Sequence, residues 1–231
     1  PYCGWTKSCV IRSAFFFREI MCRDWAIFDL VRSNKNEKTI PLIIDRNIVW
    51  KIINSIRTPH NYTYFLLIYT CGLRAGEALR LTPKDIDSNR MVVRIVKSKG
   101  KRTREVPLPQ FTLDMLRKYW ATHRNPNFIF PAVGQNMKGA PTANRHMLLS
   151  SIQDVLRKVC HDLKLMQKIT PHTFRHCYAT HLLDAGVNIR MVQLFLGHAN
   201  ITTTCIYLHV SKNGMSQAVK IATDIFGGKN A

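Results

Sequence analysis

The sequence predicts a mainly α-helical domain with a small antiparallel β-sheet, an α+β fold. Apolar residues recur at helical spacing through most of the 231 residues. The stretch from Met91 to Leu108 instead holds two runs rich in β-branched residues, on either side of a turn that contains Gly100. Hydrophobic residues make up 46% of the chain, which supports a packed core and excludes wholesale disorder.

Capping residues and apolar periodicity predict the helices in chain order. Asp45 and Asn61 are placed to cap the second and third helices. Thr170, with Pro171 at the first helical position, opens a later helix, and Asn188 opens the next. The predicted helices cover residues 10–32 (as one helix or two), 46–56, 62–69, 111–121, 144–165, 171–185, 189–196, 201–210 and 215–226.

The two main strands are predicted between the third and fourth of these helices. Asp87–Arg90 predicts a turn into a first strand over Met91–Val96. Lys97–Thr103 predicts the hairpin turn, and Arg104–Leu108 returns as the second strand. Phe128–Phe130 is long enough for a short third strand.

The charge of the chain indicates a polyanionic partner. Lys and Arg number 34 against 14 Asp and Glu, a formal charge of +20 with a pI near 10.1. Nucleic acid is the commonest such partner. A membrane surface is the alternative, but no long basic amphipathic helix is present to bind one. The apolar runs Ala14–Phe17 and Phe65–Tyr69 are too short to cross a bilayer, and no signal peptide is recognisable.

The cysteines indicate a reducing compartment. All seven are scattered, and none belongs to a Cys-x-x-Cys pair. This pattern favours the cytoplasm over a disulfide framework or a zinc ribbon. The chain opens on Pro1 without an initiator Met, so we expect a fragment of a longer product.

Two stripes run along the helix that begins at Pro171. The core stripe comprises Phe174, Cys177, Tyr178, His181, Leu182 and Ala185. The opposite stripe comprises His172, Arg175, His176 and Ala179. There His172 and Arg175 lie one turn apart, either as a catalytic pair or as part of a solvated polar face. A metal site is disfavoured because no acidic residue accompanies the histidines.

Arg74 and Glu77 form another candidate pair. Gly72 and Gly76 flank the arginine, which predicts a junction between helices at this point. At i,i+3 spacing the two side chains suit an ordinary ion pair. Alternatively, Arg74 binds a phosphate, because an arginine fork matches phosphate oxygens, and Glu77 orients it.

The remaining candidates also have two interpretations each. Lys99 lies in the predicted hairpin turn, which is either solvated or inserted against DNA. His198 follows Gly197 and suits a helix C-terminal cap. Tyr207 stands between two apolar residues and suits a core aromatic.

Taken in order, these residues form a known pattern. The pattern is Gly-Leu-Arg74-x-x-Glu77, a hairpin Lys99, His172-x-x-Arg175, Gly-His198, and Tyr207 nine residues later. In it the chain resembles the tyrosine recombinases, which include phage-type integrases and Xer and integron-type recombinases, from about Pro41 to Val210. The resemblance implies the tyrosine-recombinase catalytic fold. It also implies a site-specific recombinase or integrase that cleaves and rejoins DNA through a 3′-phosphotyrosine intermediate.

The resemblance assigns a role to each residue. Arg74 and Arg175 bind the non-bridging oxygens of the scissile phosphate, His198 is a further donor, and Glu77 orients Arg74. Tyr207 attacks the phosphate and leaves a free 5′-hydroxyl. A free tyrosine is only ~0.1% ionised at pH 7, so about 4 kcal/mol of activation is required, which arginines and a histidine can supply electrostatically.

Proton transfer and DNA contacts fall to other residues. Lys99 is the expected general acid for the 5′-oxygen, although Lys97 and Lys101 are close enough to leave the assignment open. His172 is the expected acceptor of the tyrosine proton. Further DNA contacts are expected from Lys97, Lys101, Arg102 and His176. No cofactor and no metal ion is implied, since no Asp/Glu cluster of metal-ligand type is apparent.

The resemblance also divides the chain. Residues 1–33 resemble the last part of a helical core-binding domain, 34–42 a linker, 43–213 the catalytic domain and 214–231 a tail helix. Ala218, Ile221, Ala222 and Ile225 form an apolar stripe on that tail. It either packs on its own domain or docks into a neighbour, which couples protomers in a tetrameric synapse on double-stranded DNA. A protein of this kind is expected at the nucleoid, in the cytoplasm.

Two other functions fit the same residues. A type IB topoisomerase shares the chemistry and relaxes supercoils without a defined site. A decayed recombinase or a regulator would bind DNA without cleaving it. Covalent trapping of the protein on a nicked duplex would distinguish an enzyme from a protein that only binds DNA. Relaxation of supercoiled DNA that lacks a special site would distinguish a topoisomerase from a recombinase.

Overall fold

The computed structural model describes residues 41–97, 101–132 and 139–208, without the side chains of residues 97, 101 and 102. Residue contacts divide the chain into two units, Pro1–Thr39 and Ile40–Ala231, and all described residues belong to the second. The helices predicted over residues 10–32 and 215–226 and the turn residue Lys99 lie outside the described residues.

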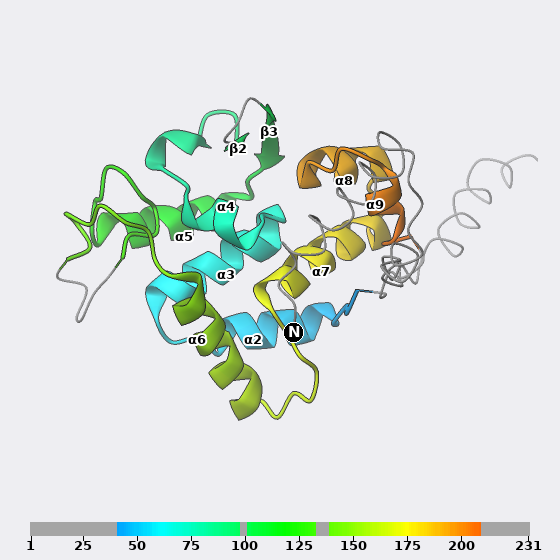
Figure 1. The fold of residues 1–231 in the computed structure, drawn as a ribbon, viewed down its shortest axis with the longest axis horizontal. Coiled ribbons are helices and arrows are strands. Elements are labelled where there is room, and N and C mark those ends of the chain that lie inside the picture. The colour runs from blue at the N-terminus through cyan, green and yellow to red at the C-terminus, as the bar shows by residue number, and fades with distance from the viewer. Residues whose placement is uncertain (1–40, 98–100, 133–138, 209–231) are drawn as a thin grey trace, which may run out of the picture. The chain divides into compact units, whose positions relative to one another are not determined.

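The described part is mainly helical, as predicted (Figure 1). Its helices are α2 (Arg46–Asn54), α3 (Pro59–Cys71), α4 (Ala75–Leu79), the 3-10 helix η3 (Pro83–Asp85), α5 (Gln110–Ala121), α6 (Leu149–Asp162), α7 (Pro171–Asp184), α8 (Ile189–Leu196) and α9 (Thr202–Cys205). None of these helices is long and apolar enough to cross a membrane.

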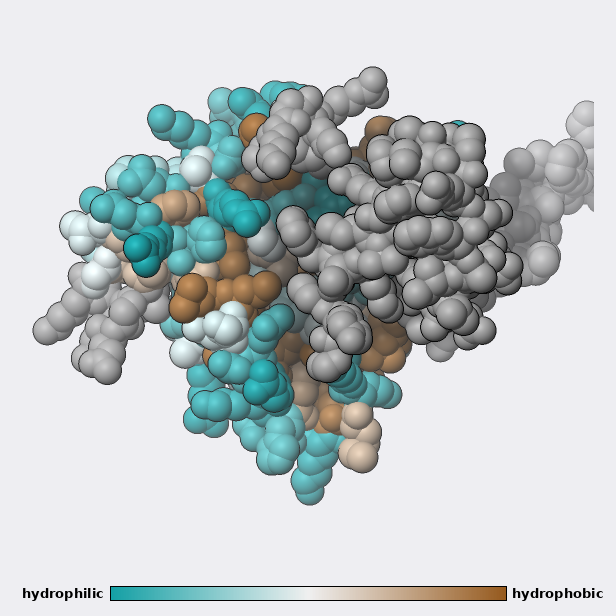
Figure 2. Space-filling model, viewed as in Figure 1, coloured by the Kyte–Doolittle hydropathy of each residue, from teal (hydrophilic) through white to brown (hydrophobic). Residues whose placement is uncertain are grey.

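Helix α3 forms the centre of the core. It contains no Asp, Glu, Lys or Arg, and residues on all of its sides are buried. It packs against α2, α4, α5 and α7. A helix that is apolar all round must be surrounded by other elements, which explains this position. On the face shown in Figure 2, the described residues are mostly hydrophilic, with hydrophobic residues in the middle of the face.

The small antiparallel sheet has the order β1-β2-β3, formed by Ile86–Asp87, Val92–Lys97 and Lys101–Pro107. Val93 pairs with Val106, and Ile95 pairs with Arg104. All four residues are buried on one face of the sheet. Strand β3 packs against α8, which brings the hairpin to the C-terminal half of the chain (Figure 1).

The predicted third strand, Phe128–Phe130, is wrong. The sheet is instead completed by β1, whose second residue, Asp87, was predicted as the start of a turn. Ile129 and Phe130 are buried, but their backbones bond to loops: Ile129 N–H donates to the Leu81 carbonyl, and Met147 N–H donates to the Phe130 carbonyl. Burial of an apolar run therefore did not require a strand partner.

Several predicted helix ends also differ. Helix α3 begins at Pro59, so Asn61 is not a cap; it lies in the first turn, and its amide donates to Thr58 Oγ1 at 2.7 Å. Helix α6 begins at Leu149 instead of residue 144, because the preceding residues form backbone hydrogen bonds with Phe130 and Ala132. Helix α9 ends at Cys205. The predicted caps Asp45, Thr170 and Asn188 are confirmed.

Helix α7 is buried on both predicted stripes. Ala179, on the stripe opposite the core, is fully buried, whereas Ala185, predicted for the core, is exposed. Leu183 is buried near that end instead. Because α7 packs against both α3 and α8, Arg175 and Ala179 on its polar stripe face another layer of protein, whereas His172 at the start of the helix is exposed.

Candidate active site

Two helices end at the same point, next to Arg175. Gly72 ends α3 with φ of 60°, and Gly197 ends α8 with φ of 62°, a left-handed conformation that glycine adopts without steric cost. Arg175 Nη1 donates to the Gly72 carbonyl and Nη2 to the Leu196 carbonyl, each at 2.6 Å. The guanidinium therefore lies at the negative ends of two helix dipoles, which favour a cation.

Arg175 is almost completely enclosed, with 1% of its surface exposed. Burial, followed by the charges of Arg74 and Arg104, lowers its pKa to about 10, so it remains a cation at neutral pH. The solvated-face interpretation is therefore wrong for Arg175. A fixed, enclosed guanidinium is preorganised to stabilise an anion.

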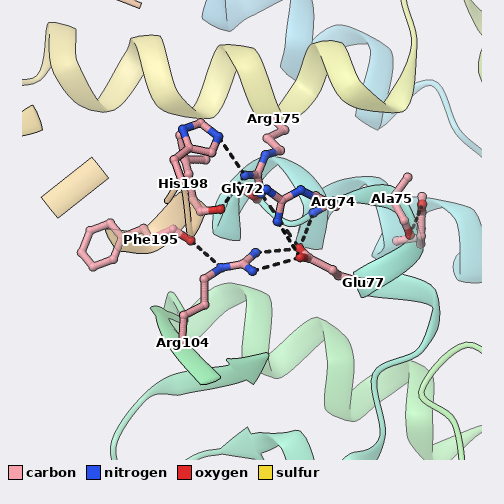
Figure 3. Close-up of polar contacts among 10 residues, drawn as sticks. Gly72, Arg74, Ala75, Glu77, Arg104, Arg175, Phe195 and His198 are labelled. Atoms are coloured by element: carbon pink, nitrogen blue, oxygen red, sulfur yellow. Dashed lines mark hydrogen bonds and ion pairs between the residues drawn. The ribbon is translucent and has the colours of Figure 1, made fainter. Parts of the chain in front are cut away.

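Glu77 lies between three arginine side chains (Figure 3). Arg74 donates to it from its backbone N–H at 2.9 Å and from Nη1 at 2.8 Å. Arg104 donates from Nη1 at 2.9 Å and from Nη2 at 2.6 Å. Arg175 Nη1 lies 4.0 Å from Glu77 Oε2. One carboxylate among three guanidiniums leaves an excess of positive charge for a bound anion to neutralise.

The pKa of Glu77 reflects these partners. Burial alone would raise it, but the hydrogen bond and charge of Arg104, followed by the hydrogen bonds of Arg74, outweigh burial and lower the pKa to about 2. Glu77 is therefore ionised throughout the physiological range. It holds the arginine side chains in fixed positions before any ligand arrives.

Arg104 is a site residue that the sequence analysis missed. Its side chain is 7% exposed, and its Nε also donates to the Phe195 carbonyl at 2.9 Å, so it ties β3 to α4 and α8. With all three nitrogens bonded to protein acceptors, it positions Glu77. The available signal was strand alternation: Arg104 shares the inward side of β3 with Val106, and a charged residue there requires a buried partner.

Arg74 remains accessible. Its side chain is 40% exposed, and it is the N-cap residue of α4, where its backbone N–H donates to Glu77 Oε2, which confirms the predicted helix junction. A groove of about 740 Å³ is lined by this residue together with Arg80 and Arg94, and with the carboxylates of Glu77 and Asp85. Arg74 thus connects the enclosed cluster to a basic surface.

His198 completes the cluster on the α8 side. Its Nε2 lies 3.3 Å from Arg175 Nη2, and its Nδ1 lies 2.9 Å from Thr204 Oγ1. Because a guanidinium can only donate, Nε2 accepts and Nδ1 carries the hydrogen in this arrangement. Burial, followed by the charges of Arg175 and Arg74, lowers the pKa of His198 to about 4. The imidazole is therefore neutral at pH 7.

Tyr207 is enclosed in a second hydrophobic cluster and is only 3% exposed. Its hydroxyl lies 2.8 Å from His176 Nδ1, and its ring centroid lies 6.4 Å from that of His198. Burial raises the pKa of Tyr207, and the charges of Arg175 and Arg74 oppose this rise. The ring is thus a core aromatic, as one interpretation held, while the hydroxyl contacts a histidine beside the arginine cluster.

His172 lies at the open side of the site. It is exposed, and its ring centroid lies 4.4 Å from that of His176, one turn further along α7. Partial burial, followed by the charges of Arg175 and Arg74, lowers its pKa. Within the described residues, His172 reaches Tyr207 only through His176.

The fold thus brings most of the predicted site residues together. One connected set of contacts comprises Arg74, Glu77, Arg175 and His198, and an adjoining set comprises His172, His176 and Tyr207. Lys97 and Lys101 pair by their backbones at the end of the hairpin, but their side chains, that of Arg102 and all of Lys99 lie outside the described residues. Across the described ranges, no three His, Cys, Asp or Glu side chains are grouped to hold a metal ion.

Comparison with known proteins agrees with this geometry. Residues 44–214 match the model of the phage integrase family. The chain is 34% identical over 203 residues to the putative integrase/recombinase y4qK of Sinorhizobium fredii, covering 86% of this chain and 62% of that protein. The chain therefore spans less than two thirds of that relative.

Solved structures share the fold. XerH site-specific recombinase, bound to a palindromic difH substrate in a post-cleavage complex, superposes with a TM-score of 0.66 at 24% identity, over 82% of this chain and 55% of that one. The Tn1549 transposon integrase, in complex with circular intermediate DNA, gives a TM-score of 0.68 at 20% identity, over 88% of this chain and 73% of that one. The family match covers most of the described residues and the whole arginine, histidine and tyrosine cluster. The chain therefore belongs to the phage integrase family, whose members include the tyrosine recombinases.

Proposed function

We propose that this chain is the catalytic part of a site-specific DNA recombinase that breaks and rejoins strands through a 3′-phosphotyrosine. The observation that carries the proposal is the cluster of the accessible Arg74, the buried Arg175 and His198, whose ring lies 6.4 Å from that of Tyr207. An excess of guanidinium charge beside a protein hydroxyl suits covalent transfer of a phosphodiester. The DNA-bound relatives of the same fold support this assignment.

Within this function, the residues divide the work. Arg74 and Arg175 bind the non-bridging oxygens of the scissile phosphate, because planar forks match phosphate geometry. His198 donates to the same phosphate once its Nε2 is released from Arg175 and protonated. Tyr207 attacks phosphorus, and a histidine of the α7 polar stripe receives its proton. The tyrosine ester conserves the energy of the broken bond, so the ends rejoin without ATP.

The hairpin supplies the leaving-group chemistry in this proposal. Lys99, at the turn between β2 and β3, protonates the departing 5′-oxygen, with Lys97 and Lys101 as alternatives. Lys101 and Arg102 add phosphate contacts. Strand β3 supports this arrangement because Arg104 ties it to Glu77 in the cluster. His176, which is expected to contact DNA, has its ring against that of Tyr207.

The division of the chain and its assembly remain part of the proposal. Residues 1–33 correspond to the end of a core-binding domain, residues 34–42 to a linker and residues 43–213 to the catalytic domain. Residues 214–231 form a tail helix that docks into a neighbouring protomer of a tetrameric synapse at the nucleoid. Deleting residues after Gly214 would then impair pairing of two sites while monomeric DNA binding continues.

Trapping the covalent intermediate tests the function. The probe is a nicked duplex carrying a site that the full chain selects from a random-sequence pool. We expect a denaturation-resistant protein–DNA adduct whose DNA-bearing peptide contains Tyr207, and we expect none from Tyr207→Phe, which loses only the hydroxyl. An adduct on Tyr64 or Tyr178, or one that persists in the Phe variant, would contradict the proposal. DNA binding without any adduct would support a protein that binds DNA without cleaving it. Relaxation of supercoiled DNA that lacks the selected site would support a type IB topoisomerase.

A further inference from the structure

The hydroxyl of Tyr207 has a specific partner. Its Oη lies 2.8 Å from His176 Nδ1, and the ring centroids are 5.6 Å apart. Among the described residues, His176 is the only hydrogen-bond partner of this hydroxyl. The expected proton acceptor, His172, has its ring against His176 and not against the tyrosine.

Both partners of this hydrogen bond are neutral at pH 7. Burial, followed by the charges of His172 and Arg175, lowers the pKa of His176 to about 4, so the ring is neutral at pH 7. Burial raises the pKa of Tyr207, so the hydroxyl keeps its hydrogen. In the tautomer of His176 that carries its hydrogen on Nε2, Nδ1 accepts the hydrogen bond that Tyr207 Oη donates.

The surroundings favour an acceptor that starts neutral. The groups that face His176 are His172 on the same helix, Arg175 next to it in the chain, Tyr207 from the segment after α9, and His198 from the end of α8. None of them is acidic. The positive charge of Arg175 is one of the causes that lower the pKa of His176. The negative charge of a bound phosphate would offset this effect of Arg175. Binding of DNA thus increases the basicity of His176 at the moment when the proton must leave.

We propose that His176, and not His172, is the general base that takes the proton of Tyr207 during strand cleavage. This inference rests on the proposed function. As Oη forms its bond to phosphorus, the Oη–H proton passes to Nδ1, which gives an imidazolium. The bond from phosphorus to the 5′-oxygen breaks, and that oxygen takes a proton from the hairpin lysine. Both protons return when a strand is rejoined.

A single asparagine substitution separates base catalysis from positioning. The amide oxygen of His176→Asn stands near the position of Nδ1 and accepts the same hydrogen bond, but it has no basicity. His176→Ala removes both properties. The matched control is His181→Asn, because His181 lies on the same helix and its Nδ1 is 2.9 Å from the hydroxyl of another tyrosine, Tyr69.

The measurement is the single-turnover rate of adduct formation on the nicked duplex, from pH 6 to pH 10. At pH 7 we expect His176→Asn and His176→Ala to be slower than wild type by roughly 10²–10⁴-fold, the usual contribution of a general base. Their rates should then rise about tenfold per pH unit as hydroxide replaces the imidazole. DNA affinity should change little, and His181→Asn should retain the wild-type rate and profile.

Other outcomes overturn the proposal. A His176→Asn rate within a few-fold of wild type shows that the hydrogen bond alone suffices. If His172→Asn loses as much of the adduct rate as His176→Asn and shows the same pH profile, the role of general base returns to His172. If wild type forms no adduct at Tyr207, the proposed function itself fails, which is a distinguishable result.

A second measurement needs neither DNA nor an active variant. In nitrogen-15 spectra of histidine-labelled full chain, the His176 signals are those that disappear in His176→Asn. We expect Nδ1 to have the shift of an unprotonated, hydrogen-bonded nitrogen and Nε2 that of a protonated one. A hydrogen on Nδ1 at pH 7 would make His176 a donor to Tyr207 and would contradict the inference.

Discussion

At the scale of single residues, Glu77 links the parts of the site. It accepts hydrogen bonds from Arg74 and Arg104 and lies near Arg175, so one carboxylate sets the positions of two proposed phosphate ligands. Arg104 keeps this carboxylate from pairing with Arg74 alone. If Arg104 were lost, Glu77 would bind Arg74 more tightly and withdraw it from a phosphate.

This arrangement predicts an unusual double-mutant result. Arg104→Met should slow cleavage by roughly 10–100-fold with little change in DNA affinity. The reason is that Glu77 would then hold Arg74 away from the phosphate in the transition state. Adding Glu77→Gln should restore part of the rate, since the neutral amide no longer competes for Arg74. The measurement is the adduct rate of both single variants and of the double variant. Simple addition of the two losses would show that Arg104 acts only through stability.

The lowered pKa of Glu77 also predicts how the free energy of unfolding depends on pH. Its folded-state pKa of about 2 lies below the ordinary value of 4.5, so its contribution to stability is complete above pH 4.5 and is lost as the pH falls toward 2. The free energy of unfolding of wild type should therefore fall relative to that of Glu77→Gln over this range. Denaturant titrations at several pH values measure the difference. A constant difference would mean that Glu77 has similar pKa values in the folded and unfolded chains.

At the scale of elements, three helix ends build the site. Helices α3 and α8 deliver their last carbonyls to Arg175, and α4 begins at Arg74. Left-handed glycines end α3 and α8 and allow the close approach. A Cβ at Gly72 would lie 2.2 Å from the Tyr178 ring, and one at Gly197 would lie 2.6 Å from Arg104 Cδ.

Gly72→Ala should therefore destabilise the protein and impair the site. Strain at positive φ and the clash with Tyr178 should together cost about 2–4 kcal/mol. The end of α3 would shift and draw its carbonyl away from Arg175. Thermal melting and the adduct rate measure both effects. Gly139→Ala is the control, because its Cβ would meet no atom within 4 Å. Equal melting temperatures for the two variants would contradict the close packing at Gly72.

At the scale of the whole molecule, the charge of +20 predicts how DNA would be found and held in the proposed function. The groove beside Arg74 adds Arg80 and Arg94 to the arginines of the cluster, against the carboxylates of Glu77 and Asp85, which leaves an excess of positive side chains along it. Phosphate contacts of this kind release counterions, so affinity depends on salt. The sequence-independent part of DNA binding should come mainly from this surface.

Salt titrations test this role. Neutralising five phosphates gives a slope of log affinity against log salt of about −4.5, and each lost contact reduces its magnitude by about 0.9. Arg80→Gln should produce one such reduction on a duplex of any sequence. The control, Arg157→Gln, lies on α6 and is paired with Asp154, and it should leave the slope unchanged. A flat salt response of wild type would show that the charge serves another partner.

Much of the fold could be predicted because its signals are local. Asp45, Thr170 and Asn188 cap their helices through neighbouring backbone groups, so the sequence nearby contains the whole interaction. The hairpin follows from two apolar runs around a turn. The third strand was misplaced because the apolar run Phe128–Phe130 is buried by loops, and periodicity does not show what covers a buried segment.

For the site, the sequence by itself determined which residue types occur in which order, and this was enough to predict Arg74, Glu77, Arg175, His198 and Tyr207. Only the tertiary structure decided which side chains contact one another. Arg104 bonds to Glu77 across 27 residues, and His176 meets Tyr207 across 31. Such contacts depend on how β3, α8 and α9 pack against the helices before them. No local pattern encodes that packing, because a charged residue in a strand or a second histidine on a helix looks the same whether it faces solvent or a partner.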